Sequence, residues 1–411
     1  MNIGIVTTWF ERGAAYVSRQ YMDSLAREHD VFIYARAGEA YAKGDPVWDK
    51  DYVTWGRRLN IPISTVMDKK DFQRWITLNH IEAVLFNEQQ WWRPVLWASE
   101  TGALTGAYVD YYTEETIPLF AAYDFLLCNT RRHYSAFDWH PQAVYIPWGT
   151  DLELFSPRSL SPVEPGRVVF FHSAGMNPER KGTDLVIRAF AGVKDGAKLV
   201  IHSQKDLKKF FPKLKDLIAG LEKQGRLVCH EETVTAPGLY HLGDVYVYPS
   251  RLEGIGLTMA EALACGLPLI TVDFPPMNEF VDSSVSRAVK IERTFARADG
   301  YYWPQCIADL GSLTEAMNHY AARPGTAGKL KKAARKYAEK NLDWMKNTTE
   351  MVKSIRDYKK LSQDYKREAA WKILHSTHHG MGLAEKASQK NTFLLKLPNW
   401  VWKILKAFFK S

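Results

Sequence analysis

The most constraining feature of the sequence is the alternation of short apolar segments with helix-like segments. A first series of apolar segments consists of NIGIVTT, VFIYAR, AVLF, GALTGAYV, FLLC and AVYIP. A second series consists of RVVFFHS, KLVIHS, RLVCHE, DVYVYPS and LPLITV. Short apolar strands that alternate with helices are typical of parallel sheets covered by helices on both faces. Two such series therefore predict an α/β protein with two doubly wound domains.

A segment rich in Pro, Ser and Gly separates the two series and is typical of a linker; it covers residues 146–166. We therefore expect one Rossmann-like domain over residues 1–150 and a second over residues 151–340. In open parallel sheets, ligands bind at the carboxyl ends of the strands. Two such domains facing each other would place a binding cleft between them.

Basic residues are concentrated at the carboxy-terminal end of the chain. The formal net charge is +8, and residues 351–411 alone hold 13 Lys/Arg and 4 Asp/Glu. The rest of the chain is close to neutral, which disfavours nucleic-acid binding because that function needs a basic face on the folded domain. The tail is instead expected to contact an anionic surface.

Residues 399–410 have the composition of a helix that lies in the headgroup region of a membrane. Three lysines, Lys403, Lys406 and Lys410, fall on one narrow face of the helical wheel, and aromatic and aliphatic side chains fill the rest. Twelve residues are too few to cross a bilayer, so we expect this helix, preceded by a loop within 376–411, to bind an anionic membrane surface. The alternative is that its apolar face packs on the amino-terminal domain.

The remaining composition favours a cytoplasmic protein, peripheral on the cytosolic face of a membrane. The sequence contains no apolar window long enough for a transmembrane helix, and its start, MNIGIVTTWF, lacks the basic region of a signal peptide. The four cysteines lie far apart without paired spacing, which disfavours disulfides and a zinc site. The oligomeric state is not indicated by the sequence.

The segment EGIGLTMAEALACGLP, residues 253–268, places two carboxylates around a strand-to-helix loop. Glu253 lies in the loop, and Glu261 lies about one turn inside the helix that follows. Glycines let backbone N–H groups approach a ligand, and a helix N-terminus favours an anion. The pattern suits a ligand with a phosphate and hydroxyls. The alternative is that both glutamates are solvated residues at a helix end.

A second candidate phosphate site is SAGMNPERKGTDLVIRAF, residues 173–190. It follows an apolar strand and opens a helix for which Thr183 is the expected N-cap. Arg180 and Lys181 lie at the mouth of this turn, and two cations beside a helix N-terminus suit a diphosphate. An ordinary basic loop is the alternative.

Three motifs in this order resemble the family-4 retaining glycosyltransferases of the GT-B fold. They are IPWGTDLELFSP, NPERKGTDLVIRAF and GDVYVYPSRLEGIGLTMAEALACGLPLITVDFPPMNEF. The resemblance covers roughly residues 1–345 and is strongest over 143–280. It implies the GT-B fold, with helices over 341–375 returning to the amino-terminal domain. It also implies a carboxy-terminal domain that binds a nucleotide-activated sugar.

The resemblance assigns roles to individual residues of the second domain. Glu253 would lie near the donor sugar, Glu261 would bind the ribose hydroxyls, and Lys181 would hold the diphosphate. The backbone around the sugar and phosphates would come from Gly254, Ile255, Gly256 and Leu257. The catalytic residues are then Glu253 and Lys181, with an acceptor-side group in the first domain.

The sequence departs from the family pattern at three places. Met176 stands where the family usually has an arginine, and Arg180 is expected to supply the missing charge to the donor. The amino-terminal loop WFERGAAYVS keeps one glycine, Gly13, as the expected donor-binding residue. Asp110, in AYVDYYTEE, lies where many members carry a histidine, and it is the candidate acceptor-side catalytic group.

The segment FNEQQWWRP follows a predicted strand and is the candidate acceptor site. Trp91 and Trp92 would stack on an acceptor sugar and Glu88 would bind its hydroxyls, together with Tyr111 from the segment DYYTEE. The alternative is that one tryptophan lies in the core and the other covers it. Asp49 and Asp51 resemble a metal-binding aspartate pair but fit a solvated loop better, so no metal and no cofactor are expected.

These patterns predict a metal-independent retaining glycosyltransferase. It would move a hexose-type sugar from a nucleoside-diphosphate sugar to a glycolipid, a polysaccharide or another glycan acceptor. Alternatives on the same architecture are a nucleotide-sugar epimerase, a phosphorylase and a non-catalytic sugar-nucleotide-binding scaffold. A dinucleotide oxidoreductase is disfavoured because no Gly-x-Gly-x-x-Gly follows the first strand.

Overall fold

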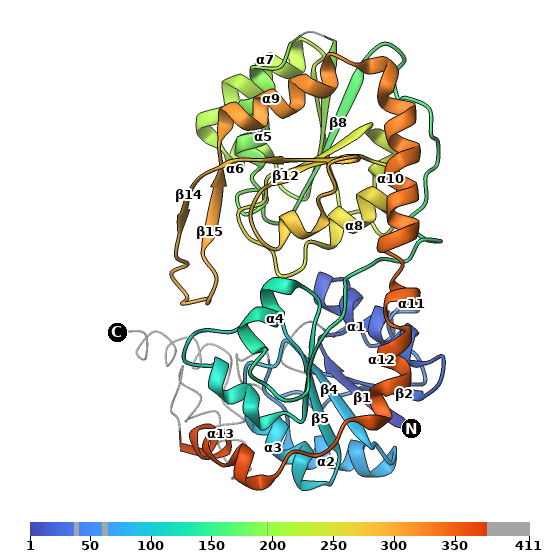
Figure 1. The fold of residues 1–411 in the computed structure, drawn as a ribbon, viewed down its shortest axis with the longest axis vertical. Helices are drawn as coiled ribbons and strands as arrows, with labels where there is room; N and C mark the ends of the chain where they lie inside the picture. Colours follow the sequence, from blue (N-terminus) through green and yellow to red (C-terminus); the bar gives the residue numbers. More distant parts are fainter. Residues whose placement is uncertain (37–40, 60–64, 195, 376–411) are drawn as a thin grey trace. The chain divides into compact units, whose positions relative to one another are not determined.

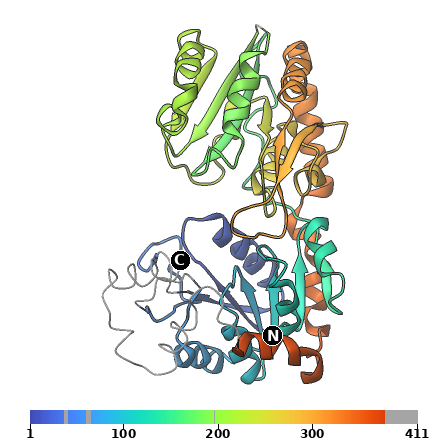
Figure 2. The ribbon, with the colours of Figure 1, turned by 90° about the vertical axis from the view of Figure 1, so that its left-hand side faces the viewer.

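The computed structural model describes residues 1–36, 41–59, 65–194 and 196–375. The chain folds into two α/β units, each built on one parallel sheet with helices on both faces (Figures 1 and 2). Unit 1 consists of Met1–Asn129, His133–Ile146 and the described chain from Thr348 onward; unit 2 consists of Thr130–Arg132 and Pro147–Asn347. The predicted fold class, two doubly wound Rossmann-like domains, is confirmed.

Unit 1 contains a seven-stranded parallel sheet in the order β3-β2-β1-β4-β5-β6-β7. Its strands are β1 Asn2–Thr7, β2 Asp30–Ala35, β3 Val53–Trp55, β4 Ala83–Asn87, β5 Leu104–Tyr108, β6 Phe125–Cys128 and β7 Ala143–Tyr145. The central strands are mostly apolar and buried because both faces of a parallel sheet are covered. All five residues of β4 are buried, for example.

The helices of unit 1 come from both ends of the sequence. They are α1 Gly13–Leu25, α2 Lys69–Leu78, α3 Arg93–Glu100, η1 Ile117–Ala122, α4 Arg131–Phe137, α12 Thr349–Ser354, η6 Ile355–Asp357 and α13 Gln363–His375. A buried ion pair of 2.6 Å between Lys366 of α13 and Asp124 ties the last described helix to this unit. Residues 399–410, the predicted membrane helix, lie outside the described residues.

Unit 2 contains a six-stranded parallel sheet in the order β10-β9-β8-β11-β12-β13. Its strands are β8 Val168–Gly175, β9 Ala197–Ser203, β10 Leu227–Glu231, β11 Val245–Tyr248, β12 Leu269–Val272 and β13 Ser286–Val289. An antiparallel hairpin of β14 Ile291–Phe295 and β15 Gln305–Ala308 follows the sheet. Figure 1 shows this hairpin standing away from the six strands.

The helices of unit 2 alternate with its strands. They are α5 Thr183–Ala191, α6 Leu207–Phe210, η2 Pro212–Leu214, α7 Lys215–Lys223, η3 Tyr240–Leu242, α8 Leu257–Ala264, η4 Met277–Phe280, α9 Leu310–Ala321, η5 Pro324–Thr326, α10 Ala327–Asn341 and α11 Trp344–Asn347. Helix α8 is apolar on most of its surface because the sheet and α10 both cover it. None of the helices in the described ranges is both long and apolar enough to span a membrane.

Candidate functional site

Two loops at the carboxyl edge of the unit 2 sheet form the centre of the candidate site. Strands β8 and β11 are parallel neighbours, so the loops that follow them emerge at the same edge. Gly182 ends the first loop with a φ of +72°, and a Cβ at this position would lie 2.2 Å from the backbone oxygen of Pro249. Because only glycine fits this approach, the two loops pack directly against each other.

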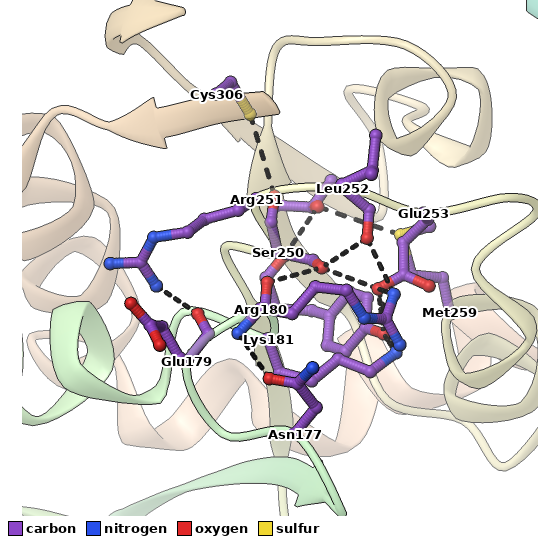
Figure 3. Close-up of polar contacts among 12 residues, drawn as sticks. Asn177, Glu179, Arg180, Lys181, Ser250, Arg251, Leu252, Glu253, Met259 and Cys306 are labelled. Atoms are coloured by element: carbon purple, nitrogen blue, oxygen red, sulfur yellow. Dashed lines mark hydrogen bonds and ion pairs between the residues drawn. The ribbon is translucent and has the colours of Figure 1, made fainter. Parts of the chain in front are cut away.

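Four side chains converge on one oxygen of Glu253 (Figure 3). Its Oε1 lies 3.0 Å from Nη1 of Arg180 and 2.8 Å from Nζ of Lys181. The same oxygen accepts hydrogen bonds from the hydroxyls of Tyr248, at 2.8 Å, and Ser250, at 2.6 Å. Glu253 is only 5% exposed. The structure therefore holds a buried carboxylate between two cations and two hydroxyls.

The charges of this cluster set its protonation. Burial raises the pKa of Glu253, but the charges of Arg180 and Lys181 outweigh burial and lower that pKa to about 2. Burial and the charge of Arg180 lower the pKa of Lys181 to about 8, against the attraction of Glu253. Near pH 7 the carboxylate is ionised and both cations are largely charged. The three groups together therefore carry a net positive charge, which suits an anionic ligand.

Backbone contacts fix the two loops to each other. The N–H of Arg251 donates to the carbonyl of Arg180 at 2.7 Å, and Nη1 of Arg180 donates to the carbonyl of Leu252 at 2.7 Å. The guanidinium of Arg251 donates to both oxygens of Asp184, each at 2.8 Å, in the bidentate geometry that arginine favours. The first two hydrogen bonds hold Arg180 through its backbone carbonyl and through its guanidinium.

The start of α5 differs from the sequence prediction. Gly182 is the N-cap, and Thr183 is the first helical residue. The Thr183 hydroxyl instead lies 2.8 Å from Nε2 of His172, which is fully buried in β8. Burial lowers the pKa of His172 to about 4, so the ring is neutral near pH 7. Thr183 therefore links helix and strand and does not cap the helix.

Glu261 lies on α8, the helix that follows the Glu253 loop. The helix begins after Gly256, whose φ is +93° and whose added Cβ would lie 2.2 Å from Cε of Met259. The hydroxyl of Tyr240 donates a hydrogen bond to Oε2 of Glu261. Burial raises the pKa of Glu261 to about 7, although the hydrogen bond from Tyr240 opposes this shift. Glu261 therefore titrates near neutrality.

The other predicted donor-binding residues lie between Glu253 and α8. A Cβ on Gly254 would meet no atom within 4 Å, so there is room for a side chain at this position. Ile255 is 4% exposed, whereas Leu257 at the start of α8 is half-buried. The loop therefore leaves room at Gly254, whereas the Ile255 side chain is buried.

A second polar cluster lies in unit 1 at the carboxyl ends of β4 and β5. Glu88, Asp110 and Tyr111 line one small pocket there. Glu88 has a φ of +51°, which is uncommon for a residue other than glycine, and its carboxylate lies 3.1 Å from Nη2 of Arg12. Burial and the charge of Glu88 raise the pKa of Asp110 well above its usual range. Burial and the neighbouring carboxylate therefore favour the protonated form of Asp110.

The two tryptophans of the predicted acceptor site differ in burial. Trp91 is 2% exposed and packs edge-on against Trp97, with ring centroids 5.0 Å apart. A buried indole has no face to offer a sugar, so Trp91 is a core residue and the predicted stacking role is corrected. Trp92 is half-buried and packs edge-on against Phe120 at 4.8 Å. Trp91 thus lies in the core, whereas Trp92 packs against Phe120 and keeps part of its surface exposed.

Two further predicted positions lie outside the unit 2 cluster. Gly13 is the first residue of α1 in unit 1, so it does not belong to the loops that hold Glu253. Met176, which stands in place of the family arginine, is 71% exposed. Arg180 is the residue that brings a second cation to Glu253.

Asp49, one of the two aspartates considered as a metal site, is held by contacts within its own loop. Asp49 accepts hydrogen bonds from Nε1 of Trp55 at 2.5 Å and from the N–H of Gly44 at 2.7 Å, so its carboxylate shapes its own loop. Within the described ranges, no three His, Cys, Asp or Glu side chains gather as metal ligands would.

Four residues of the unit 2 cluster were not predicted from the sequence: Tyr240, Tyr248, Ser250 and Arg251. Tyr248 and Ser250 are the last residues of the motif DVYVYPS. The end of a parallel strand is where binding side chains gather, and this position was the available signal. The Tyr240 and Arg251 contacts depend on residues distant in sequence, and no local pattern indicates them.

Comparison with known proteins places this cluster in a family. Residues 166–298 match the family model described as Glycosyl transferases group 1. The D-inositol 3-phosphate glycosyltransferase of Paenarthrobacter aurescens is 32% identical over 187 residues, which are 40% of this chain and 42% of that protein. The lipopolysaccharide core biosynthesis mannosyltransferase LpsB of Rhizobium meliloti is 30% identical over 107 residues, which are 25% of this chain and 30% of that protein. The chain thus matches less than half the length of these two relatives.

A solved structure extends the similarity to the whole fold. The HepE protein of Anabaena, in complex with UDP and glucose, matches with a TM-score of 0.64 and 14% identity, covering 87% of this chain and 100% of that chain. At this identity the likeness shows the fold alone. The family match, in contrast, spans the loops that carry Arg180, Lys181 and Glu253. Residues 166–298 thus match the glycosyl transferases group 1 family model, and the two-unit fold of the chain resembles that of the solved neighbour.

Proposed function

We propose that the chain is a retaining glycosyltransferase that moves a hexose-type sugar from a nucleoside-diphosphate sugar to a glycan, glycolipid or polysaccharide hydroxyl. The observation that carries this proposal is the convergence of Arg180 and Lys181 on the buried carboxylate of Glu253. This net positive group lies at the carboxyl edge of a parallel sheet, beside the N-terminus of α8. An anion that carries a sugar fits both features.

In the proposed reaction, the bond between the sugar and the diphosphate breaks while the acceptor oxygen bonds to the same face of the anomeric carbon. The acceptor proton passes to the departing phosphate oxygen, so no strong protein base is needed. Lys181 and Arg180 stabilise the charge that develops on the diphosphate, which is the usual form of electrostatic catalysis. The ionised Glu253 stabilises positive charge on the sugar ring.

Glu261 is proposed to bind the ribose of the donor. Its pKa of about 7 in the unliganded protein means that part of the population is neutral at physiological pH. Ribose hydroxyls donate hydrogen bonds to a carboxylate and favour its ionised form. Donor binding is therefore coupled to the release of a proton from Glu261.

The acceptor is proposed to bind at the unit 1 cluster of Glu88, Asp110, Tyr111 and Trp92. The raised pKa of Asp110 favours its protonated form, which donates and accepts hydrogen bonds and would orient an acceptor hydroxyl without acting as its base. The two curated relatives support hydroxyl-rich acceptors, since their names mention an inositol phosphate and a lipopolysaccharide core.

The proposal includes peripheral binding to an anionic membrane through residues 399–410. The support is their sequence: three lysines on one face with tryptophan and phenylalanine on the others. Each basic residue near anionic lipid contributes on the order of 1 kcal/mol. The full chain should float with phosphatidylserine vesicles, and a chain truncated after Asn391 should not. Equal flotation of both chains, or of neither, would contradict this part of the proposal.

Product analysis tests the proposed reaction. The chain is incubated with UDP-glucose, UDP-galactose or GDP-mannose and a panel of glycoside acceptors, with EDTA present throughout. A transferase releases nucleoside diphosphate rapidly only with an acceptor, and EDTA leaves the rate unchanged because the two cations replace a metal. Formation of a sugar phosphate from inorganic phosphate would indicate a phosphorylase. Formation of an isomerised nucleotide sugar would indicate an epimerase, and donor binding without turnover would indicate a non-catalytic scaffold. Loss of turnover in EDTA that magnesium restores would contradict metal independence.

A further inference from the structure

Arg36 is a buried residue of unit 1 that the proposed function does not use. It directly follows β2 and is only 1% exposed. Strand β1 lies between β2 and β4 in the sheet, so the Arg36 side chain reaches past β1 to contact the segment after β4 (Figure 1). Burying a guanidinium is costly unless its N–H groups find acceptors. The acceptors that it contacts therefore indicate what the residue is placed to hold.

The guanidinium of Arg36 holds three consecutive residues at the carboxyl end of β4. Its Nη1 donates to the carbonyl of Asn87 at 2.6 Å, to the carbonyl of Glu88 at 3.2 Å and to Oε1 of Gln89 at 3.3 Å. Two of these three acceptors belong to the backbone. Removing the guanidinium would therefore free the main chain of this segment as well as one side chain.

The two neighbours of Glu88 are buried and make further hydrogen bonds. Nδ2 of Asn87 donates to the carbonyl of Ala14 on α1 at 2.9 Å. Nε2 of Gln89 donates to the carbonyl of Trp91 at 2.6 Å. Both ends of the segment around Glu88 are therefore anchored, and Arg36 contacts the backbone between these anchors.

Glu88 itself has a backbone conformation that its surroundings must impose. Its φ of +51° is unfavourable for a residue other than glycine, and such strained residues gather at binding sites. In this conformation Glu88 lines the same pocket as Asp110, and its carboxylate lies 3.1 Å from Nη2 of Arg12. The charge of Arg36 also lowers the pKa of Asp110, against burial and Glu88. The guanidinium of Arg36 therefore acts on the acceptor cluster by contact and by charge.

We propose that Arg36 is a positioning residue for acceptor binding, which holds the backbone of residues 87–89 so that the Glu88 carboxylate is presented to the acceptor hydroxyls. This inference rests on the proposed function for the identity of the ligand. A purely structural arginine would stabilise the chain without affecting one substrate more than the other. The printed hydrogen bonds of the Arg36 side chain all end on the segment that carries Glu88. Its removal therefore weakens acceptor binding and leaves donor binding in unit 2 unchanged.

Steady-state kinetics of Arg36→Met test this role, because methionine is unbranched and suits a buried position but donates no hydrogen bond. UDP-glucose, UDP-galactose and GDP-mannose serve as donors, and the methyl glycosides of glucose, galactose and mannose serve as acceptors. Calorimetry gives the affinities for UDP and GDP, and circular dichroism verifies folding. Arg36→Lys keeps the charge but not the planar fork of donors, and it provides the test if Arg36→Met does not fold.

Arg226→Met is the matched control. Arg226 is half-buried in unit 2, and its Nη2 donates to the carbonyl of Val193 at 2.6 Å. The control therefore also removes a guanidinium that holds a backbone carbonyl, but one outside the acceptor cluster. It should bind donor and acceptor as the wild-type chain does.

The KM for the acceptor should rise about tenfold or more in the folded Arg36 variant, as expected for lost hydrogen bonds of a charged group. Its kcat and its nucleotide affinity should be nearly unchanged. Glu88→Gln should raise the same KM, and adding Arg36→Met to it should raise the KM no further, because both changes act on one contact. An unchanged KM, a parallel loss of nucleotide affinity, or effects that multiply in the double variant would overturn the role.

Amide hydrogen exchange of the peptide that contains residues 87–91 gives a second measurement, which needs no turnover. Its amides should exchange about tenfold faster in the Arg36 variant than in the wild-type chain, and Arg226→Met should leave them unchanged. Unchanged exchange in the Arg36 variant also overturns the role. A wild-type chain that turns over no donor would instead contradict the transferase function, and the exchange data would still decide whether Arg36 holds this segment.

Discussion

The polar clusters of units 1 and 2 occupy equivalent places in two similar sheets. In unit 1, Arg12 follows β1 and pairs with Glu88, which follows the adjacent β4. In unit 2, Arg180 and Lys181 follow β8 and pair with Glu253, which follows the adjacent β11. Both pairs therefore join a cation after the first strand of the unit to a carboxylate after the strand beside it.

The difference between these pairs is burial. The side chains of Arg12 and Glu88 are 43% and 25% exposed, whereas those of Lys181 and Glu253 are 15% and 7% exposed. Water and salt screen an exposed pair, and a surface ion pair contributes about 0–1 kcal/mol. A buried pair keeps its full interaction and shifts the pKa of both partners. The same position in the fold therefore holds a partly exposed ion pair in unit 1 and a buried, preorganised charge cluster in unit 2.

The largest expected effect comes from breaking the buried pair. Glu253→Gln leaves Arg180 and Lys181 without their carboxylate, so we expect kcat to fall roughly 10²–10³-fold, as when a preorganised electrostatic group is removed. The free energy of unfolding should fall by about 3–5 kcal/mol because the largely buried Lys181 loses its carboxylate. Steady-state kinetics and urea denaturation measure the two effects.

Two matched variants sharpen this test. Glu179→Gln removes an exposed carboxylate from the same loop and should leave kcat unchanged. Arg12→Gln breaks the exposed pair of unit 1 and should change stability by less than about 1 kcal/mol. Equal destabilisation by Arg12→Gln and Glu253→Gln would contradict the role assigned to burial.

A smaller effect is expected at Asp110. Burial and the neighbouring carboxylate of Glu88 raise the pKa of Asp110, whereas the cations around Glu253 lower the pKa of Glu253. Because the raised pKa of Asp110 favours its protonated form, Asp110→Asn should keep kcat/KM for the acceptor within a few-fold, whereas Asp110→Ala should lower it by roughly 10–100-fold through lost hydrogen bonds. If Asp110 were an ionised base, the asparagine variant would lose about 10²–10⁴-fold. Initial rates at varied acceptor concentration distinguish the two cases, and UDP affinity serves as the control.

The sequence supports prediction of both sheets and of the loops that hold the functional residues. Apolar strands in two series identify parallel sheets, and in such sheets the carboxyl ends of strands carry the binding loops. This reasoning places Lys181, Glu253 and Glu261 on the correct elements. Local patterns are sufficient here because each assignment depends on one strand and the loop that follows it.

Contacts between segments that are distant in the sequence could not be predicted in this way. Lys181 and Glu253 are separated by 72 positions, and their contact requires the approach of Gly182 to Pro249. Trp91 was misassigned because side chains in a loop follow no period that would separate inward from outward positions. The hairpin β14–β15 contains the turn segment ADG, but its attachment to Arg251 is visible only in three dimensions.

The close approach of the two unit 2 loops is itself testable. Gly182→Ala introduces a Cβ 2.2 Å from a backbone oxygen at a φ of +72°, and we expect a loss of about 2–3 kcal/mol in stability together with weaker donor binding. Gly175→Ala is the matched control, because Gly175 also has a positive φ, +55°, but open space around its Cβ. Gly175→Ala should lose less stability, because an alanine there carries only the cost of a positive φ. If thermal denaturation showed an equal loss of stability in both variants, the contact between the two loops would not contribute to stability.

The pH dependence of donor binding separates the roles of Glu261 and Lys181. UDP-glucose is a suitable probe because its diphosphate does not titrate near neutrality. Ribose binds the ionised form of Glu261, so affinity should fall as the pH drops below the pKa of about 7. The diphosphate binds protonated Lys181, so affinity should also fall as the pH rises above about 8. Each limb approaches a tenfold change per pH unit far from the pKa, and calorimetry from pH 5.5 to 9.5 records both.

Single substitutions assign the two limbs of this profile. Glu261→Gln should flatten the acid limb while keeping the basic limb, since glutamine does not titrate. Lys181→Arg should flatten the basic limb, because arginine stays protonated throughout this range. In buffers of different ionisation enthalpy, the wild-type chain near pH 7 should show proton release on binding, because the ligand lowers the pKa of Glu261. An acid limb that persists in Glu261→Gln would remove the carboxylate from ribose binding, and only the cations would then define the donor site.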